Sequence, residues 1–260
     1  TGNFVGNPTT QLPVICKDAG DVAIVDLDGD GDNDLIVCDG GTVSPGVTRF
    51  DNIAGGLFLV GTNAIDDAYT IATGDYNGDG FLDWAIGGTT NGTDETRILW
   101  GSASGSWTVF NSTVIGGLPE AAAHWLRARD MDGDGDLDLL YAGASQNGVL
   151  INDGSGNFSL SPIATTSSPG LPNPRLDAVD FDQDGDLDVV HLVRPGPQSY
   201  CVVEVNNGNT QFTKSWYLPL RGSPSTPASG GYCLVADLDG DGDDDIAAGG
   251  YPSTILVNDN

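Results

Sequence analysis

The stretch from Asp26 to Val37, DLDGDGDNDLIV, has an acidic residue at every second position and then changes to a run of apolar residues. Two unit charges about 4 Å apart repel by roughly 4 kcal/mol at an effective dielectric constant near 20. Carboxylates this close together therefore need a positive charge among them. The chain supplies few such charges, because nine Lys and Arg residues face 37 Asp and Glu residues. We therefore expect a metal ion to bind in this stretch.

The spacing of the oxygen atoms indicates calcium. Ligands at positions 1, 3, 5, 7 and 9 of a loop, with Gly at position 6 for a sharp turn, are typical of calcium-binding loops. Magnesium prefers a tighter octahedron, and zinc prefers His or Cys, which the loop lacks. For a single loop, a solvated acidic turn without metal is the alternative. The expected ligands, with position 7 acting through its main-chain carbonyl, are Asp26, Asp28, Asp30, Asp32 and Asp34, and Gly31 is at position 6.

Four further copies of the loop make a solvated turn a poor explanation. They read DYNGDGFLD, DMDGDGDLD, DFDQDGDLD and DLDGDGDDD, and position 6 is Gly in each. Asn77 is the one side chain at positions 1, 3, 5 and 9 that is not Asp, so we expect its loop to bind calcium most weakly. The expected ligands are Asp75, Asn77, Asp79, Phe81 and Asp83 in the second loop; Asp130, Asp132, Asp134, Asp136 and Asp138 in the third; Asp180, Asp182, Asp184, Asp186 and Asp188 in the fourth; and Asp237, Asp239, Asp241, Asp243 and Asp245 in the fifth.

The loops recur at a nearly constant interval, since successive copies start 49, 55, 50 and 57 residues apart. Such a period is typical of a solenoid or a propeller. Each loop lies between two short apolar segments, such as VAIVD and DLIVCD, and two more segments follow, as in GVLINDGSGNFSLS. These segments are typical of strands joined by turns. Four strands per repeat are typical of one blade of a β-propeller.

The sequence therefore predicts an all-β fold in one domain over residues 1–260. We expect a five-bladed β-propeller of four-stranded antiparallel blades, with calcium loops at 26–34, 75–83, 130–138, 180–188 and 237–245.

The last repeat lacks a fourth strand, because the chain ends at STILVNDN. The first residues, TGNFVGNP, placed after ILVNDN resemble VLINDGSGNFSLSP at 149–162. We therefore expect the N-terminal strand to complete the last blade and close the ring. In the alternative, the same ends join between neighbouring molecules and give a homopolymer by terminal strand exchange. Closure within one chain is favoured because it avoids the entropy cost of association.

These repeats resemble a known family. The loop DMDGDGDLD, which leads into DLLYAG and is followed by VLINDGSGNF, resembles the FG-GAP and VCBS repeats, the calcium-bearing blades also found in integrin α-chain propellers. The resemblance implies a secreted or cell-surface propeller with calcium in the loop between the first two strands of each blade. It implies adhesion, carbohydrate binding or scaffolding more often than catalysis. The family commonly has seven blades, so five is a departure that leaves open whether the ring is complete.

Composition agrees with an extracellular or cell-surface location. A formal net charge of −28 argues against nucleic acid and anionic membranes as partners, because both require basic patches. No apolar run approaches the roughly 18 residues of a membrane span. The chain begins at Thr1 without a Met, so we expect that a leader has been removed or that the domain is excised from a larger protein. A protein or glycan ligand at a cell surface is the expected partner.

The four cysteines form an even set without a C-x-x-C motif, which favours disulfides in an oxidising compartment. Their order suggests that Cys16 pairs with Cys38 and that Cys201 pairs with Cys233. Four buried free thiols are the alternative.

Little in the sequence indicates catalysis, and we expect a non-enzymatic protein. The two histidines, His124 and His191, lie in strand-like segments and are expected to be structural. No Ser lies in a nucleophile-elbow motif, and the paired acids are explained by the metal loops. Arg127, Arg129 and Arg175 could converge with His124 on a small anion or sugar, or they could instead pair with neighbouring Asp residues.

Three functions follow from these features. The first is a calcium-stabilised propeller for adhesion, scaffolding or self-assembly, and this is the function we expect. The second is a lectin, and the third is an accessory or catalytic domain of a polysaccharide-active enzyme, which would need an unexplained His, Tyr and Arg cluster. We expect the tryptophans to pack between blades, with stacking on sugars as the alternative; they are Trp84, Trp100, Trp107, Trp125 and Trp216.

Overall fold

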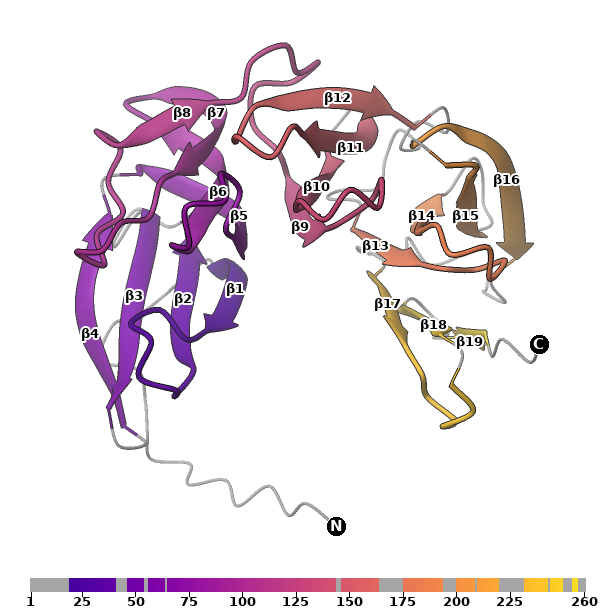
Figure 1. Ribbon diagram of the computed structural model, residues 1–260, viewed down its shortest axis with the longest axis horizontal. Coiled ribbons are helices and arrows are strands. Elements are labelled where there is room, and N and C mark those ends of the chain that lie inside the picture. Colours follow the sequence, from indigo (N-terminus) through magenta and orange to yellow (C-terminus); the bar gives the residue numbers. More distant parts are fainter. Residues whose placement is uncertain are drawn as a thin grey trace, which may run out of the picture.

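In a computed structural model of the chain, the described residues form five antiparallel β-sheets (Figure 1). The structure describes residues 19–40, 46–53, 56–63, 65–143, 146–163, 175–193, 200–208, 210–219, 232–242, 244–249 and 254–256. Within these ranges every regular element is a strand, and no helix there is long and apolar enough to cross a membrane. The predicted all-β class is therefore confirmed.

Each sheet is a meander whose strands pair in chain order, and four of the five sheets have four strands. The first contains β1 (Ala19–Val25), β2 (Asp34–Asp39), β3 (Gly46–Ile53) and β4 (Gly56–Asn63). The second contains β5 (Asp67–Gly74), β6 (Asp83–Thr90), β7 (Thr93–Leu99) and β8 (Ser112–Val114). The third contains β9 (Trp125–Arg129), β10 (Asp138–Ala142), β11 (Asn147–Asn152) and β12 (Phe158–Pro162). The fourth contains β13 (Leu176–Val179), β14 (Asp188–Val193), β15 (Tyr200–Asn206) and β16 (Phe212–Pro219), and the fifth contains β17 (Tyr232–Ala236), β18 (Asp245–Gly249) and β19 (Thr254–Leu256).

The sheets follow one another around an arc, with the first strand of each sheet on the inner side (Figure 1). Apolar residues fill the space between each sheet and the next, giving four separate core clusters. Trp84 and Trp107 stack at 4.7 Å between the first two sheets, and Trp125 is buried between the third and the fourth. The expected packing of these tryptophans between blades is therefore confirmed. The second strand of the third sheet is buried on both faces, since all five residues of β10 are buried.

Polar contacts also join the inner strands of neighbouring sheets. The Thr70 hydroxyl donates to Asp21 Oδ2 at 2.9 Å and accepts the Leu126 N–H at 3.0 Å, which links the first three sheets. Close approach is possible at Gly87, where a Cβ would lie 2.1 Å from the carbonyl oxygen of Ala123 in the next sheet. The consecutive sheets are thus in direct contact through main chain as well as side chains.

The two ends of the arc carry exposed apolar side chains, and the described strands form no closed sheet. Val22 and Ile24 of β1 are 53% and 68% exposed, on the face opposite to the core of the first two sheets. Leu234 of β17 and Ile255 of β19 are 58% and 61% exposed on the outer face of the last sheet. The predicted fourth strand of that sheet, at residues 1–8, lies outside the described residues. Ring closure therefore stays a prediction.

The structure does not show the predicted Cys201–Cys233 disulfide, because both residues are free thiols. Cys201 lies on β15 and Cys233 on β17, and both belong to the apolar core between the last two sheets. A hydrogen bond from the Cys233 thiol to Cys201, together with burial, raises the pKa of Cys233 well above its ordinary value. The thiolate, which is the form that makes disulfides, is therefore disfavoured. Cys38 is also a buried free thiol, and its expected partner Cys16 lies outside the described residues.

Candidate metal centres

The five acidic loops join the first two strands of each sheet, as the sequence predicted. In every loop the glycine at position 6 has a positive φ, a conformation that residues with a side chain rarely adopt. The sharp turn at this position lets alternate side chains point to one side of the loop. The φ angles are 93° for Gly31, 86° for Gly80, 97° for Gly135, 96° for Gly185 and 101° for Gly242.

Carboxylates converge in four of the five loops, where three acidic oxygens lie within 4.8 Å of one another. The described ion pairs use carboxylates outside the loops. Carboxylates this close together repel one another. Each group offers only oxygen donors, the ligand type of hard divalent cations. The groups are Asp26, Asp28 and Asp34; Asp130, Asp132 and Asp138; Asp180, Asp182 and Asp184; and Asp237, Asp239 and Asp245.

The fourth loop contains a buried carboxylate oxygen that suits a cation. Asp180 Oδ1 is buried and accepts no hydrogen bond, whereas the equivalent Asp130 Oδ1 accepts the Gly133 N–H at 2.8 Å. At position 4 of this loop Gln183 replaces glycine and has a positive φ of 59°. A buried oxygen without a partner costs free energy. A bound cation would remove that cost.

Main-chain N–H groups hold the loop carboxylates in place. Asp26 accepts the N–H groups of Gly29 at 2.8 Å and Gly31 at 3.0 Å, and Asp237 accepts the equivalent pair at 2.6 and 3.2 Å. These bonds fix the direction of the position-1 carboxylate within the loop. The loops therefore have a defined shape built from their own residues.

The aspartate at position 9 has a structural role that the sequence analysis missed. In all five loops its Oδ2 accepts the N–H of position 2, at 2.8 to 3.0 Å. In four of them its Oδ1 accepts an N–H at the end of the third strand or two residues after it, at 2.7 to 2.8 Å. These side chains are at most 1% exposed, and they clamp each loop to its sheet; they are Asp34, Asp83, Asp138, Asp188 and Asp245.

Asparagines at the end of the third strand form a second set of contacts that was missed. Asn152 Nδ2 donates to the carbonyl of Leu137 in its own loop at 3.1 Å and to that of Tyr76 in the preceding loop at 2.8 Å. Asn206 makes the equivalent pair of contacts at 3.1 and 3.2 Å. The signal was present in the sequence, since Asn follows the third apolar segment in FDN, LIN and EVN. These side chains tie consecutive loops together.

The second loop is not among the convergent carboxylate groups found in the described residues. Asn77 takes the place of an aspartate, and its amide donates to Asp79 Oδ2 at 3.2 Å. Phe81, at position 7, is 40% exposed and would contribute through its carbonyl. Asp243 of the fifth loop lies outside the described residues. The ligand roles assigned from the sequence stay predictions at all these positions.

Replacing Asn77 with Asp is expected to tighten calcium binding at the second loop, because the site gains a negative charge. Isothermal calorimetry on the wild type and on Asn77→Asp measures the change. Asp132→Asn, the reverse change at position 3 of the third loop, is the matched control and should weaken one site. Equal or weaker binding by Asn77→Asp would show that geometry rather than charge sets the order of the sites.

Burial raises the pKa of Asp83, Asp138 and Asp188 to about 6, against opposing hydrogen bonds from main-chain N–H groups. The folded chain therefore binds more protons than the unfolded chain between about pH 4 and pH 6, and metal-free stability falls as the pH rises through that range. Protons compete with calcium for the same oxygens, so stability in calcium should rise over this range. Melting of calcium-depleted and calcium-saturated chain from pH 4.5 to 7.5 tests both trends. Two parallel curves would contradict the expectation.

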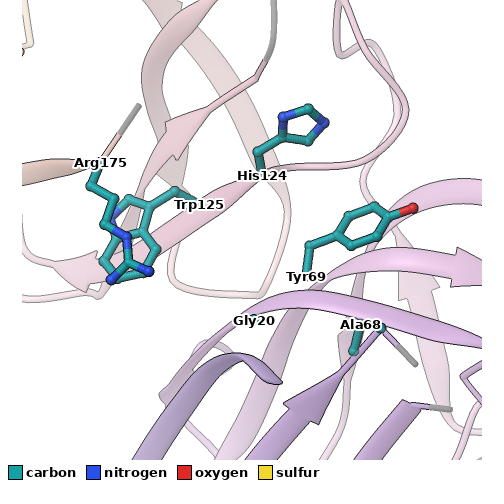
Figure 2. Close-up of a pocket in the computed structure, with 7 residues that line it drawn as sticks. Gly20, Ala68, Tyr69, His124, Trp125 and Arg175 are labelled. Carbon is teal, nitrogen blue, oxygen red and sulfur yellow. The ribbon is translucent and has the colours of Figure 1, made fainter. Parts of the chain in front are cut away.

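The histidines and arginines singled out from the sequence separate into distinct places. His191 is fully buried with Nε2 3.3 Å from Glu204 Oε1, as expected for a structural residue. Arg127 and Arg129 lie 3.6 and 3.2 Å from the carboxylate of Asp177 in the next sheet. His124 and Arg175 instead line one pocket of about 350 Å³ (Figure 2).

Comparison with known proteins gives a repeat family and a fold. The sequence model of the FG-GAP-like repeat matches residues 75–141 and 130–191. A search of curated proteins finds no match. Among solved structures, a lectin of Agrocybe aegerita that recognises non-reducing terminal N-acetylglucosamine is similar over 92% of this chain, with 20% identity and a TM-score of 0.53. The matched region spans 66% of the lectin, just under two thirds of its length.

Two longer protein chains are similar to this chain at lower TM-scores. The pore of a Photorhabdus luminescens Tc holotoxin has 21% identity and a TM-score of 0.43, over 91% of this chain and 11% of the toxin chain. The biofilm matrix protein Bap1 of V. cholerae has 19% identity and a TM-score of 0.43, over 93% of this chain and 40% of Bap1.

Proposed function

The chain carries FG-GAP-like repeats over residues 75–191, and on this premise we propose that it is a calcium-stabilised β-propeller of the cell exterior that serves adhesion or scaffolding. The observation that supports the proposal best is the convergence of three loop carboxylates in four separate sheets. In each sheet the acidic loop lies between the first and the second strand, so the carboxylate groups occupy equivalent positions in successive sheets. A fold built on this plan depends on cations for its stability.

Calcium fits the loops better than other common cations. The donors are carboxylate oxygens at alternate positions of a loop that turns at glycine, without the His or Cys that zinc prefers. When bound, calcium supplies the positive charge that offsets the repulsion among the loop carboxylates. Extracellular calcium modules commonly have dissociation constants of about 0.1–1 mM, which suits the cell exterior. This supports the proposed location.

The contacts of His191, Arg127 and Arg129 support a non-enzymatic role. The pocket that contains His124, Tyr69 and Arg175, in contrast, has the residue types that an enzyme would need. His191 is fully buried beside Glu204 and is not accessible to a substrate. Arg127 and Arg129 are paired with Asp177. A glycan-binding role is the second candidate, and the aromatic pocket around Tyr69 and Trp125 favours it.

We further propose that the two ends of the arc close into a five-bladed ring. Both ends of the arc carry exposed apolar side chains. They are Val22 and Ile24 in the first sheet and Leu234 and Ile255 in the last sheet. Burying such faces against each other is favourable by roughly 25 cal/mol per Å². Light scattering in calcium buffer separates the outcomes. A particle near 26.8 kDa agrees with closure, and a long polymer agrees with strand exchange between molecules.

The adhesion or scaffolding role is tested with immobilised chain and with a glycan array, each in calcium and in chelator. In calcium, we expect the immobilised chain to retain soluble chain, or the soluble chain to bind particular glycans on the array. In chelator, we expect this binding to be lost. The absence of any retention would contradict the proposal. Cleavage of an arrayed glycan would instead identify an enzyme.

A further inference from the structure

The pocket that contains His124 and Arg175 lies where the first strands of four sheets begin. The acidic loops follow the other ends of these same strands, so the pocket and the loops are at opposite ends of β1, β5, β9 and β13. None of the expected calcium ligands lines the pocket. Its described lining residues are Gly20, Gly40, Ala68, Tyr69, His124, Trp125 and Arg175.

One wall of the pocket is a fixed pair of an indole and a guanidinium. Trp125 Nε1 donates to the carbonyl of Leu176 at 3.0 Å, which holds the indole in place. The Arg175 guanidinium lies 4.3 Å from the centroid of the indole ring, and Figure 2 shows it stacked over that ring. Stacking orients the guanidinium plane and keeps its N–H donors around the edge of the group.

The other wall is formed by Tyr69 and His124, which Figure 2 shows on the far side of the pocket from Arg175. Their rings meet edge to face at 6.0 Å. The Tyr69 hydroxyl is within hydrogen-bond distance of Thr89 Oγ1, at 3.2 Å, so the phenol ring is held in position. Gly20 allows β1 to approach the main chain of β5 closely, because a Cβ there would lie 2.6 Å from the Tyr69 carbonyl oxygen.

We propose that this pocket binds a carboxylate-bearing sugar residue of the uronic acid class. The rings of Tyr69 and His124 offer an apolar surface on which a sugar ring can pack. Arg175 has five N–H donors in a planar fork, so it can keep its present contacts and still donate to a bound carboxylate. The two walls are held by existing contacts, so little ordering is needed when the ligand binds.

The strongly negative chain does not exclude an anion at this end. The shortest of these strands, β13, has four residues and is about 13 Å long at roughly 3.3 Å per residue. That distance exceeds one Debye length of about 8 Å at physiological salt, so the loop charges are partly screened. Two carboxylates close in sequence to lining residues have partners, since Asp21 accepts from Thr70 and Asp177 pairs with Arg129. Apart from His124, Arg175 is the only acidic or basic residue among the described lining residues.

The inference rests on the proposed role as an extracellular binding module. Its failure can be distinguished from failure of that role, because calcium binding is measured by melting and sugar binding by titration. The probes are methyl glucuronide and methyl glucoside, which differ in a carboxylate at one carbon. Acetate, the carboxylate alone, is the third probe. Each is titrated into the full chain in calcium buffer, and binding is followed by calorimetry and by saturation-transfer NMR.

We expect the glucuronide to bind about tenfold or more tightly than the glucoside, the effect of one charge-assisted hydrogen-bonded pair. Arg175→Gln should remove this difference. Arg97→Gln changes an arginine that pairs with Glu95 and is not among the described lining residues, and it should preserve the difference. Tyr69→Ala should weaken both sugars and leave acetate unchanged. This last variant keeps the inference testable if Arg175→Gln fails to fold.

Four results would overturn the inference. They are the absence of glucuronide binding, equal binding of glucuronide and glucoside, acetate binding as tight as that of the glucuronide, and an equal loss in Arg97→Gln and Arg175→Gln.

Discussion

Removal of calcium is expected to lower the melting temperature of the chain by about 14–28 °C. If each site has a dissociation constant near 0.1 mM, about 1 mM calcium stabilises the folded chain by roughly 1.4 kcal/mol per site. Five sites together contribute about 7 kcal/mol, which is comparable with the whole stability of a typical domain. A chain of this size changes its melting temperature by about 2–4 °C per kcal/mol. Circular dichroism melting in calcium and in excess chelator measures the shift.

Magnesium at the same concentration is the control for a nonspecific ionic effect. It should restore little of the lost stability, because it demands a tighter octahedron than these loops offer. An unchanged melting temperature in excess chelator would show that the loops do not depend on calcium. Full recovery with magnesium would show that any divalent ion suffices.

Replacing Asp138 with Ala is expected to destabilise the chain by about 2–6 kcal/mol whether or not calcium is present. Asp138 is fully buried and accepts the N–H groups of Met131 and Asn152, each at 2.8 Å. The substitution leaves both buried donors without a partner, at a cost of about 1–3 kcal/mol each. In calcium, the loss of one ligand adds to this effect. Urea unfolding in calcium and in chelator measures both parts.

Asp132→Ala is the matched variant in the same loop. Asp132 accepts one N–H, from Asp134 at 3.3 Å, and it is less buried than Asp138. Its replacement should cost about 1.4 kcal/mol in calcium, the contribution of one site, and far less in chelator. If Asp138→Ala is destabilising only in calcium, the clamp between loop and sheet has no independent role.

The pattern of the sequence was sufficient for the strands, the loops and their turns. Gly31 and its equivalents could be recognised because a carboxylate at every second position, with a glycine at position 6, occurs five times at a similar interval. The positive φ angles at these glycines agree with the predicted turn. Local spacing within nine residues determines this feature, so it can be found without knowledge of the tertiary contacts.

Contacts between repeats could not be predicted in the same way. Asn152 reaches the carbonyl of Tyr76, 76 residues earlier in the chain, and this pairing exists only after the second and third sheets have packed. The pocket likewise combines Tyr69, Trp125 and Arg175 from three different repeats. The position of Cys201 beside Cys233 agrees with the order of the cysteines, and both are free thiols in the apolar core of the structure.

The number of calcium ions bound per chain tests the central claim most directly. Equilibrium dialysis of the full chain against about 1 mM calcium, followed by metal analysis, gives this number, and Asp130→Ala and Asp237→Ala examine single loops. We predict about five ions for the wild type and about one fewer for each variant. Fewer than one ion per chain, or the same number in the wild type and both variants, would contradict the assignment of calcium to these loops.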